Sequence, residues 1–205
     1  MNIGANFILL DAARMEDNID KALEFNKKGL SLFAGTKDKM LEVVSPYLFS
    51  YNNKSEMALW MDEKGWGNSW GVFILCYKEF DDLYKHFKKF ILVKTEDGEE
   101  MYFRFYDPRV LRIFLPTCDS EQLKEFFGPV KAFLMEDENP EFAVVFMLSD
   151  SNELITNKIS KENFTKVIAQ GLEFIISPDQ KAPSAKPEIK QDKPAGNKGR
   201  FSIID

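Results

Sequence analysis

Three arginines and two tyrosines lie close together in one segment and are the strongest candidates for chemistry. Arg109 and Arg112 are three positions apart on an expected helix, so they share one face of it. Arg104 lies on the strand that leads into this helix, between Tyr102 and Tyr106. Guanidinium groups bind carboxylates and backbone carbonyls through paired hydrogen bonds. These residues therefore predict a recognition surface for a partner polypeptide.

A second interpretation of the same arginines is internal. Asp107 is typical of a helix N-cap, because its carboxylate can accept the unpaired N–H groups of the next turn, and Pro108 suits the first helical position. Arg104 or Arg109 would then be held by Asp107 or by another carboxylate of the domain. An anion site is the weaker alternative, because no glycine-rich loop accompanies the arginines.

Catalysis would require Asp107 to act as a base on an anionic substrate held by the arginines. A capping carboxylate beside guanidinium groups should have a lowered pKa, which makes it a poor base near neutral pH. His86 is surrounded by lysines and is expected on the polar flank of an amphipathic helix. Together with Cys76 and Cys118, His86 lacks the spacing of zinc ligands. We therefore expect no enzyme, no metal and no cofactor.

The composition of the 205-residue chain is that of a globular protein with a net charge of −6. This acidic balance argues against a binder of nucleic acid or of anionic membranes. No stretch approaches the roughly 20 apolar residues that span a bilayer, and no secretory signal is visible, so we expect a cytoplasmic protein. The 19 phenylalanines favour an aromatic-rich core, with a protein-binding surface as the alternative.

Strand and helix patterns alternate along the first 176 residues. Continuous apolar runs predict strands, and apolar residues at helical spacing predict amphipathic helices. The pattern predicts an α/β fold with a mixed, mostly covered β-sheet flanked by helices, and a small C-terminal part. Expected strands cover 6–10, 30–34, 47–51, 71–77, 91–95, 100–106, 130–135 and 142–148; expected helices include 56–63, 78–90 and a last helix capped by Ser160.

Residues 177–205 differ in composition from the expected domain of residues 1–176. They hold four of the nine prolines, with six basic and four acidic residues. Too few apolar groups are present to offset the entropy of ordering, so we expect a flexible, Pro- and Lys-rich tail. The tail ends in the apolar peptide Phe201-Ser202-Ile203-Ile204-Asp205. This peptide is either an unbound end or a short motif that docks as an added strand.

The run Phe103-Arg104-Phe105-Tyr106-Asp107-Pro108-Arg109-Val110-Leu111 resembles the core of the type VI secretion effector-adaptor domain, the Tap or TEC adaptors, formerly a domain of unknown function. The resemblance extends over about residues 7–136, although Lys88 and Lys89 stand where the family often has arginines. The other similar pieces are Leu10-Asp11-Ala12-Ala13, Leu32-Phe33-Ala34-Gly35-Thr36, Ser45-Pro46-Tyr47-Leu48, Ser69-Trp70-Gly71, Asp97-Gly98 and Phe126-Phe127-Gly128-Pro129.

This resemblance implies a non-enzymatic adaptor or chaperone. Such proteins bind a cognate toxic effector in the cytosol and assist its loading onto the VgrG spike, with no role for nucleic acid or membrane. The implied effector-binding residues are Arg104, Arg109, Arg112, Tyr102 and Tyr106. The implied structural motif comprises Asp107, Pro108, Phe126, Phe127, Gly128 and Pro129. An immunity-like inhibitor that binds a toxin is the alternative, and an enzyme acting on an anionic substrate is the least favoured.

Overall fold

The computed structural model describes residues 5–35, 41, 44–94, 97–172 and 202–203. Its centre is a seven-stranded sheet whose hydrogen-bonded pairs are all antiparallel. In spatial order the strands are β2 (Leu30–Ser31), β3 (Pro46–Ser50), β1 (Ala5–Asp11), β4 (Gly71–Cys76), β7 (Val130–Glu136), β8 (Phe142–Leu148) and β9 (Leu154–Ser160).

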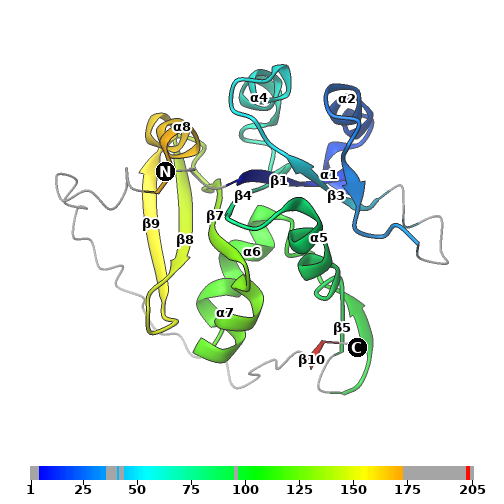
Figure 1. Cartoon of the computed structure of the whole chain (residues 1–205), viewed down its shortest axis with the longest axis vertical. Helices are drawn as coiled ribbons and strands as arrows, with labels where there is room; N and C mark the ends of the chain where they lie inside the picture. Colours follow the sequence, from blue (N-terminus) through cyan, green and yellow to red (C-terminus); the bar gives the residue numbers. More distant parts are fainter. Residues whose placement is uncertain (1–4, 36–40, 42–43, 95–96, 173–201, 204–205) are drawn as a thin grey trace.

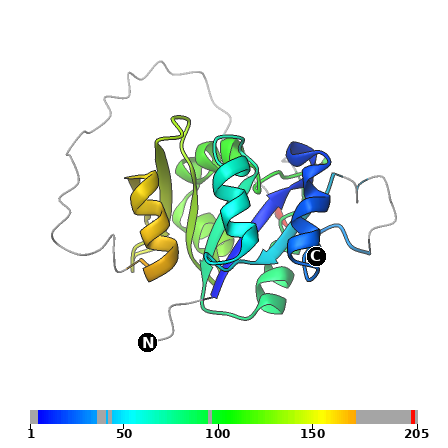
Figure 2. The same cartoon turned by 90° about the horizontal axis from the view of Figure 1, so that it is seen from above.

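Helices cover both faces of this sheet (Figure 1). One face carries α1 (Ala12–Met15), α2 (Asn18–Phe25), α4 (Glu56–Trp60), its continuation η1 (Met61–Gly65), and α8 (Lys161–Gln170). Seen from above, α8, α4 and α2 lie side by side across the sheet (Figure 2). The other face carries α5 (Phe80–Lys88), α6 (Pro108–Phe114), η2 (Leu115–Thr117) and α7 (Ser120–Phe127).

The expected α/β fold with a covered sheet is confirmed, and the strand directions follow from the connections. The crossover through α4 joins β3 to β4, which run parallel to each other but are separated by β1. Each hydrogen-bonded pair of strands in the main sheet is antiparallel. The sheet is therefore not the expected mixture of parallel and antiparallel pairs. None of the helices in the described part of the chain is long and apolar enough to cross a membrane.

Phenylalanines fill the core, as the composition favoured. Thirteen of them are buried and the other four within the described ranges are partly buried. On the face covered by α5, α6 and α7, a phenylalanine cluster surrounds the ring of Phe126, which lies 5.1 Å from Phe90, 5.6 Å from Phe105 and 5.4 Å from Phe133 between ring centroids. Packing between these aromatic rings holds α7 against β7 and against the segments that follow α5 and precede α6.

Three expectations about the strands are wrong. The strand expected at 30–34 ends at Ser31, because residues 32–35 form turns. The strand expected at 100–106 ends at Tyr102, because residues 105–107 turn toward the N-cap of α6. The edge strand β9 was not expected at all, since its residues are exposed or only partly buried and its sequence lacks a clear alternation. The expected last helix does begin after Ser160, whose hydroxyl accepts the Asn163 N–H.

A separate three-stranded sheet lies beyond the main one. It is formed by β5 (Leu92–Lys94), β6 (Glu100–Tyr102) and β10 (Ser202–Ile203), in the order β10-β5-β6. The rest of the tail expected at 177–205 lies outside the described residues, so its expected flexibility stays a prediction. The added-strand alternative agrees with β10, which pairs with β5 in antiparallel register.

Candidate functional site

The site is built at the end of β1, where several parts of the chain meet. Asp11 ends this strand opposite Pro46 of β3, and its backbone N–H donates to the Trp70 carbonyl at 2.8 Å. The next amide, of Ala12, donates to the Ser45 carbonyl at 3.3 Å. The side chain of Asp11 is fully buried at this junction. A carboxylate in such a position requires a cationic partner.

Arg104 is that partner. Its Nη2 group donates to Oδ2 of Asp11, while Oδ1 is buried with no hydrogen bond among the described residues. Burial raises the pKa of Asp11, and the hydrogen bond and charge of Arg104 oppose that rise, with the nearby Ala13 amide as the smallest contribution. The Arg104 side chain is 42% exposed, so Arg104 pairs with the buried carboxylate and still reaches solvent.

Asp107 and Arg109 form the second pair of the site. Oδ1 of Asp107 accepts the Arg109 backbone N–H and Nε, both at 3.0 Å, and Oδ2 accepts Nη2 at 2.6 Å. Arg104 Nη2 lies 3.8 Å from the same Oδ2 atom. Burial alone raises the pKa of Asp107, but the hydrogen bonds from Arg109 and the two positive charges lower it below its ordinary value. The internal network expected from the sequence is therefore present.

Arg112 does not join these two pairs. Its Nη1 donates to the backbone carbonyl of Glu136 at 2.6 Å, at the end of β7. There its charge also contributes to lowering the pKa of Asp137, although burial and closer donors have larger effects on that carboxyl. The expected three-arginine group is thus divided between Arg104 with Arg109 at Asp107 and Arg112 at β7.

The two candidate tyrosines have different environments. Tyr102 is 46% exposed and its ring meets Phe33 edge-on at 5.1 Å, so it remains available to a partner. Tyr106 is only 4% exposed, and burial raises its pKa to about 12. Because the strand ends at Tyr102, the alternation that placed Tyr106 beside it on the surface does not continue. Tyr106 is therefore buried instead of lying beside Tyr102 on the surface, and its contact with a partner stays a prediction.

The residues assigned to a structural motif are structural. Pro108 is buried at the start of α6, and Phe126 and Phe127 are buried on α7. Gly128 ends α7 with a φ of +47°, and a Cβ there would lie 2.3 Å from the His86 ring. The Pro129 carbonyl lies 3.2 Å from Cys76 Sγ.

His86 packs into the protein instead of forming a polar flank. Its Nε2 lies 2.8 Å from the Phe126 carbonyl, which fixes the tautomer that donates from this atom. Its ring is within 5.1 Å of the Phe90 ring, between centroids. Burial is the main cause of its lowered pKa, so a neutral ring is favoured.

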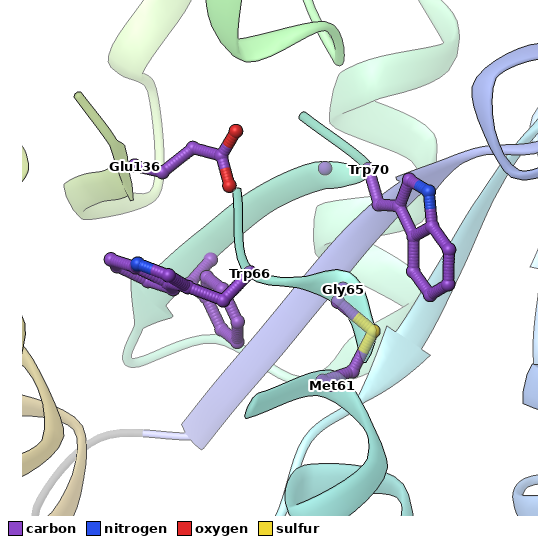
Figure 3. A pocket seen from close by; sticks show the side chains of 7 residues that line it. Met61, Gly65, Trp66, Trp70 and Glu136 are labelled. Carbon is purple, nitrogen blue, oxygen red and sulfur yellow. The ribbon is translucent and has the colours of Figure 1, made fainter. Parts of the chain in front are cut away.

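Glu136 was missed by sequence reasoning. Its buried carboxylate accepts the Gly67 N–H through Oε2 and both the N–H and hydroxyl of Ser69 through Oε1, at 2.6 to 2.8 Å. Figure 3 shows this carboxylate beside the loop that carries Trp66 and Trp70. The loop holds φ values of +90° at Gly67 and +54° at Ser69. Glu136 directly follows the apolar run Ala132–Met135 and precedes two further acidic residues, so its sequence position does not distinguish it from a surface carboxylate.

Small cavities lie away from the arginines. A cleft of about 140 Å³ opens between η1 and α8 and is lined mainly by apolar groups such as Trp66, Phe164 and Ile168. Within the described ranges, no group of three or more His, Cys, Asp or Glu side chains is placed to hold a metal ion. The site itself offers half-exposed guanidinium groups backed by buried carboxylates, an arrangement suited to hydrogen bonding with a partner chain.

Comparison with known proteins gives one family. Neither the curated proteins nor the solved structures yield a match. The model of the family described as "Domain of unknown function (DUF4123)" matches residues 6–125, which is more than half of the chain and includes Asp11, Arg104, Asp107 and Arg109. The chain therefore belongs to the DUF4123 family.

Proposed function

We propose that this protein is an adaptor or chaperone that binds a cognate type VI secretion effector in the cytosol and assists its loading onto the VgrG spike. One observation carries the proposal. Four of the separate pieces that resemble such adaptors meet at Asp11: the end of β1, the Ser45–Pro46 turn, Trp70 and the Arg104 segment all contact this residue or its neighbour. A motif dispersed over the sequence thus forms one unit in space.

The geometry of this unit suits recognition of a polypeptide. A guanidinium group has five N–H donors, and Asp107 takes up only the Nε and one Nη2 bond of Arg109. The remaining donors belong to a side chain that is 49% exposed. Ion pairing with buried carboxylates fixes both guanidinium groups in place, so less entropy is lost when a partner carbonyl or carboxylate binds. Tyr102, on the adjoining β6 strand, supplies an exposed aromatic contact.

The enzyme alternative is less compatible with these contacts. Asp107 would have to accept a proton from a substrate, yet both of its oxygens accept hydrogen bonds from Arg109. Its lowered pKa makes it a weak base near neutral pH.

Binding to the effector and spike proteins encoded beside this chain tests the proposal. We expect the effector to co-purify and to bind at micromolar concentration or tighter. Arg109→Ala and Tyr102→Ala should each weaken binding about tenfold, the effect of roughly 1.4 kcal/mol. Lys124→Ala, an exposed cation on α7, is the matched control. Urea unfolding must show that each variant is folded.

Absence of binding to either neighbour would contradict the proposal. A secretion assay then separates delivery from inhibition of a toxin. Deleting an adaptor stops effector delivery, whereas deleting an immunity-like protein poisons the producing cell. Poisoning of the cell would support the inhibitor instead.

A further inference from the structure

The small sheet includes β10, a strand from a part of the chain about 100 residues after β5 and β6. β5 pairs with β6 on one side, and on the other side it pairs with β10, with Lys94 opposite Ser202 and Val93 opposite Ile203. Figure 1 shows β10 against β5, well away from the main sheet. Among the described residues, two residue pairs connect β10 to β5.

Without β10, one edge of β5 would have no strand beside it. β5 is otherwise firmly placed, since Val93 is 2% exposed and belongs to the phenylalanine-rich core. A strand edge with unpaired N–H and C=O groups is a template for an extended peptide. Two-stranded ribbons are also only marginally stable, so a third strand strengthens the pair of β5 and β6.

This edge is continuous with the arginine site. β6 ends at Tyr102, and the next amide, of Phe103, donates to the Ile91 carbonyl at 3.0 Å. Arg104 follows directly. A strand added to β5 would therefore lie on the same ribbon that presents Tyr102 and positions Arg104.

We propose that the β5 edge is a strand-docking site whose resting occupant is Ser202–Ile203, and that an extended segment of the delivered protein replaces this occupant. The incoming segment would present an apolar residue opposite Val93, as Ile203 does in the register of β10. The displacement rests on the proposed function; the docking site itself does not.

Because Ser202–Ile203 belongs to the same chain as β5, this short strand can occupy the β5 edge and can still be replaced by another peptide. If residues 177–201 are as flexible as their composition predicts, a segment tethered by them would have an effective concentration on the order of 1 mM. If the segment alone binds with a Kd of about 0.1 mM, the edge is occupied roughly ten to one. A peptide added in trans then binds about tenfold more weakly to the full chain than to a chain whose own segment cannot pair.

Two prolines test the site in the full-length protein. Neighbouring residues of a strand direct their N–H groups to opposite sides, so one of Ser202 and Ile203 donates to β5, and proline removes the donor. The variant carries Ser202→Pro and Ile203→Pro. The matched control carries Ser184→Pro and Ala185→Pro, which leave the β10 pair intact. The probe is a fluorescent peptide of residues 198–205, followed by anisotropy.

We expect this peptide to bind the Ser202→Pro, Ile203→Pro variant about tenfold more tightly than the wild type or the control. Its binding should shift the backbone amide signals of Val93 and Lys94 in NMR spectra. A peptide that itself carries both prolines should not bind. Equal binding to all three proteins, or equal binding of the two peptides, would overturn the docking site.

The effector tests the displacement. The Ser202→Pro, Ile203→Pro variant should capture the effector more tightly than the control, and the peptide should compete. Unchanged capture with intact peptide binding would overturn displacement and leave the docking site standing. Failure of every protein to capture the effector would instead overturn the proposed function, while the peptide result still decides the docking site.

Discussion

At the scale of single residues, the two ion pairs of the site differ in what each arginine supports. Arg104 is the side chain that donates to the buried carboxylate of Asp11, whose other oxygen has no hydrogen bond within the described residues. If the Arg109 side chain were removed, the Asp107 carboxylate would still accept a hydrogen bond from the backbone N–H of residue 109 and would still lie near Arg104. Loss of one partner from a buried pair leaves an uncompensated charge.

Arg104→Ala should therefore destabilise the domain more than Arg109→Ala does. Because Arg104 is 42% exposed, we expect a loss of about 2 kcal/mol, below the full effect for a buried pair. Arg109→Ala, the matched control, should cost about 1 kcal/mol or less. Urea unfolding measures both. Adding Asp11→Asn to Arg104→Ala should recover part of the loss. Equal losses for the two single variants would contradict this assignment.

The one histidine of the chain should make stability depend on pH. The folded pKa of His86 is lowered below 6.5, mainly by burial. The unfolded chain therefore binds the proton more readily than the folded chain. The contribution of His86 to the free energy of unfolding is fully present above pH 6.5 and is lost as the pH falls from 6.5 toward the folded pKa. Urea unfolding from pH 7.5 to 6 should show this decline.

His86→Gln retains a donor for the Phe126 carbonyl and should flatten that decline. NMR titration of the His86 ring protons in the wild type should give a midpoint below 6.5. A midpoint above 6.5, or an identical slope in the variant, would show that the ring is not held neutral by burial.

Sequence reasoning about these residues succeeded where the chemistry was local. The N-cap at Asp107, followed by Pro108 at the first helical position, depends only on neighbours within two positions. The pairing of Arg104 with Asp11 spans 93 positions, so only the fold could reveal it. Tyr106 was misplaced because one turn ends the strand alternation.

At the scale of elements, Glu136 joins β7 to the loop before β4. Glu136→Gln replaces one acceptor oxygen by an NH2 donor, which would face an N–H of Gly67 or Ser69. We expect a loss of about 2 kcal/mol, since a buried donor is left unsatisfied. Glu138→Gln, an exposed position two residues on, should change stability by less than about 0.5 kcal/mol. Similar losses of unfolding free energy at both positions would contradict a stabilising role for the Glu136 carboxylate at this loop.

The strands β4 and β9 differ in how well their sequences predict them. β4 is buried along its whole length and was predicted from a continuous apolar run. β9 pairs with β8 over seven residues, yet its side chains are mostly half-exposed at the sheet edge. An edge strand with solvent on one side needs little apolar periodicity, so its pairing partner, and not its own pattern, determines it.

At the scale of the whole molecule, the region that defines the family depends on the C-terminal strands and helix. The family match ends at residue 125, but β7, β8, β9 and α8 come later and complete both the sheet and its two cores. Phe133 of β7 lies against Phe126 and Phe87, and Phe164 of α8 lies against Phe73 of β4. Aromatic rings of the family segment, such as Phe73 and Phe87, thus pack against rings that lie beyond that segment.

A chain ended after Gly128 should therefore fail to fold cooperatively, whereas one ended after Leu172 should succeed. The shorter chain loses β7, one of the two partners of β4, since Ile74 pairs with Phe133, and it exposes an edge and a face that are otherwise buried. Such surface gives compact states without fixed packing. We expect the shorter chain to bind the dye ANS and to lack a near-UV circular dichroism spectrum, and the longer chain to unfold in one transition. A native spectrum from the shorter chain would show that β7 to β9 are an addition to a core that is already complete.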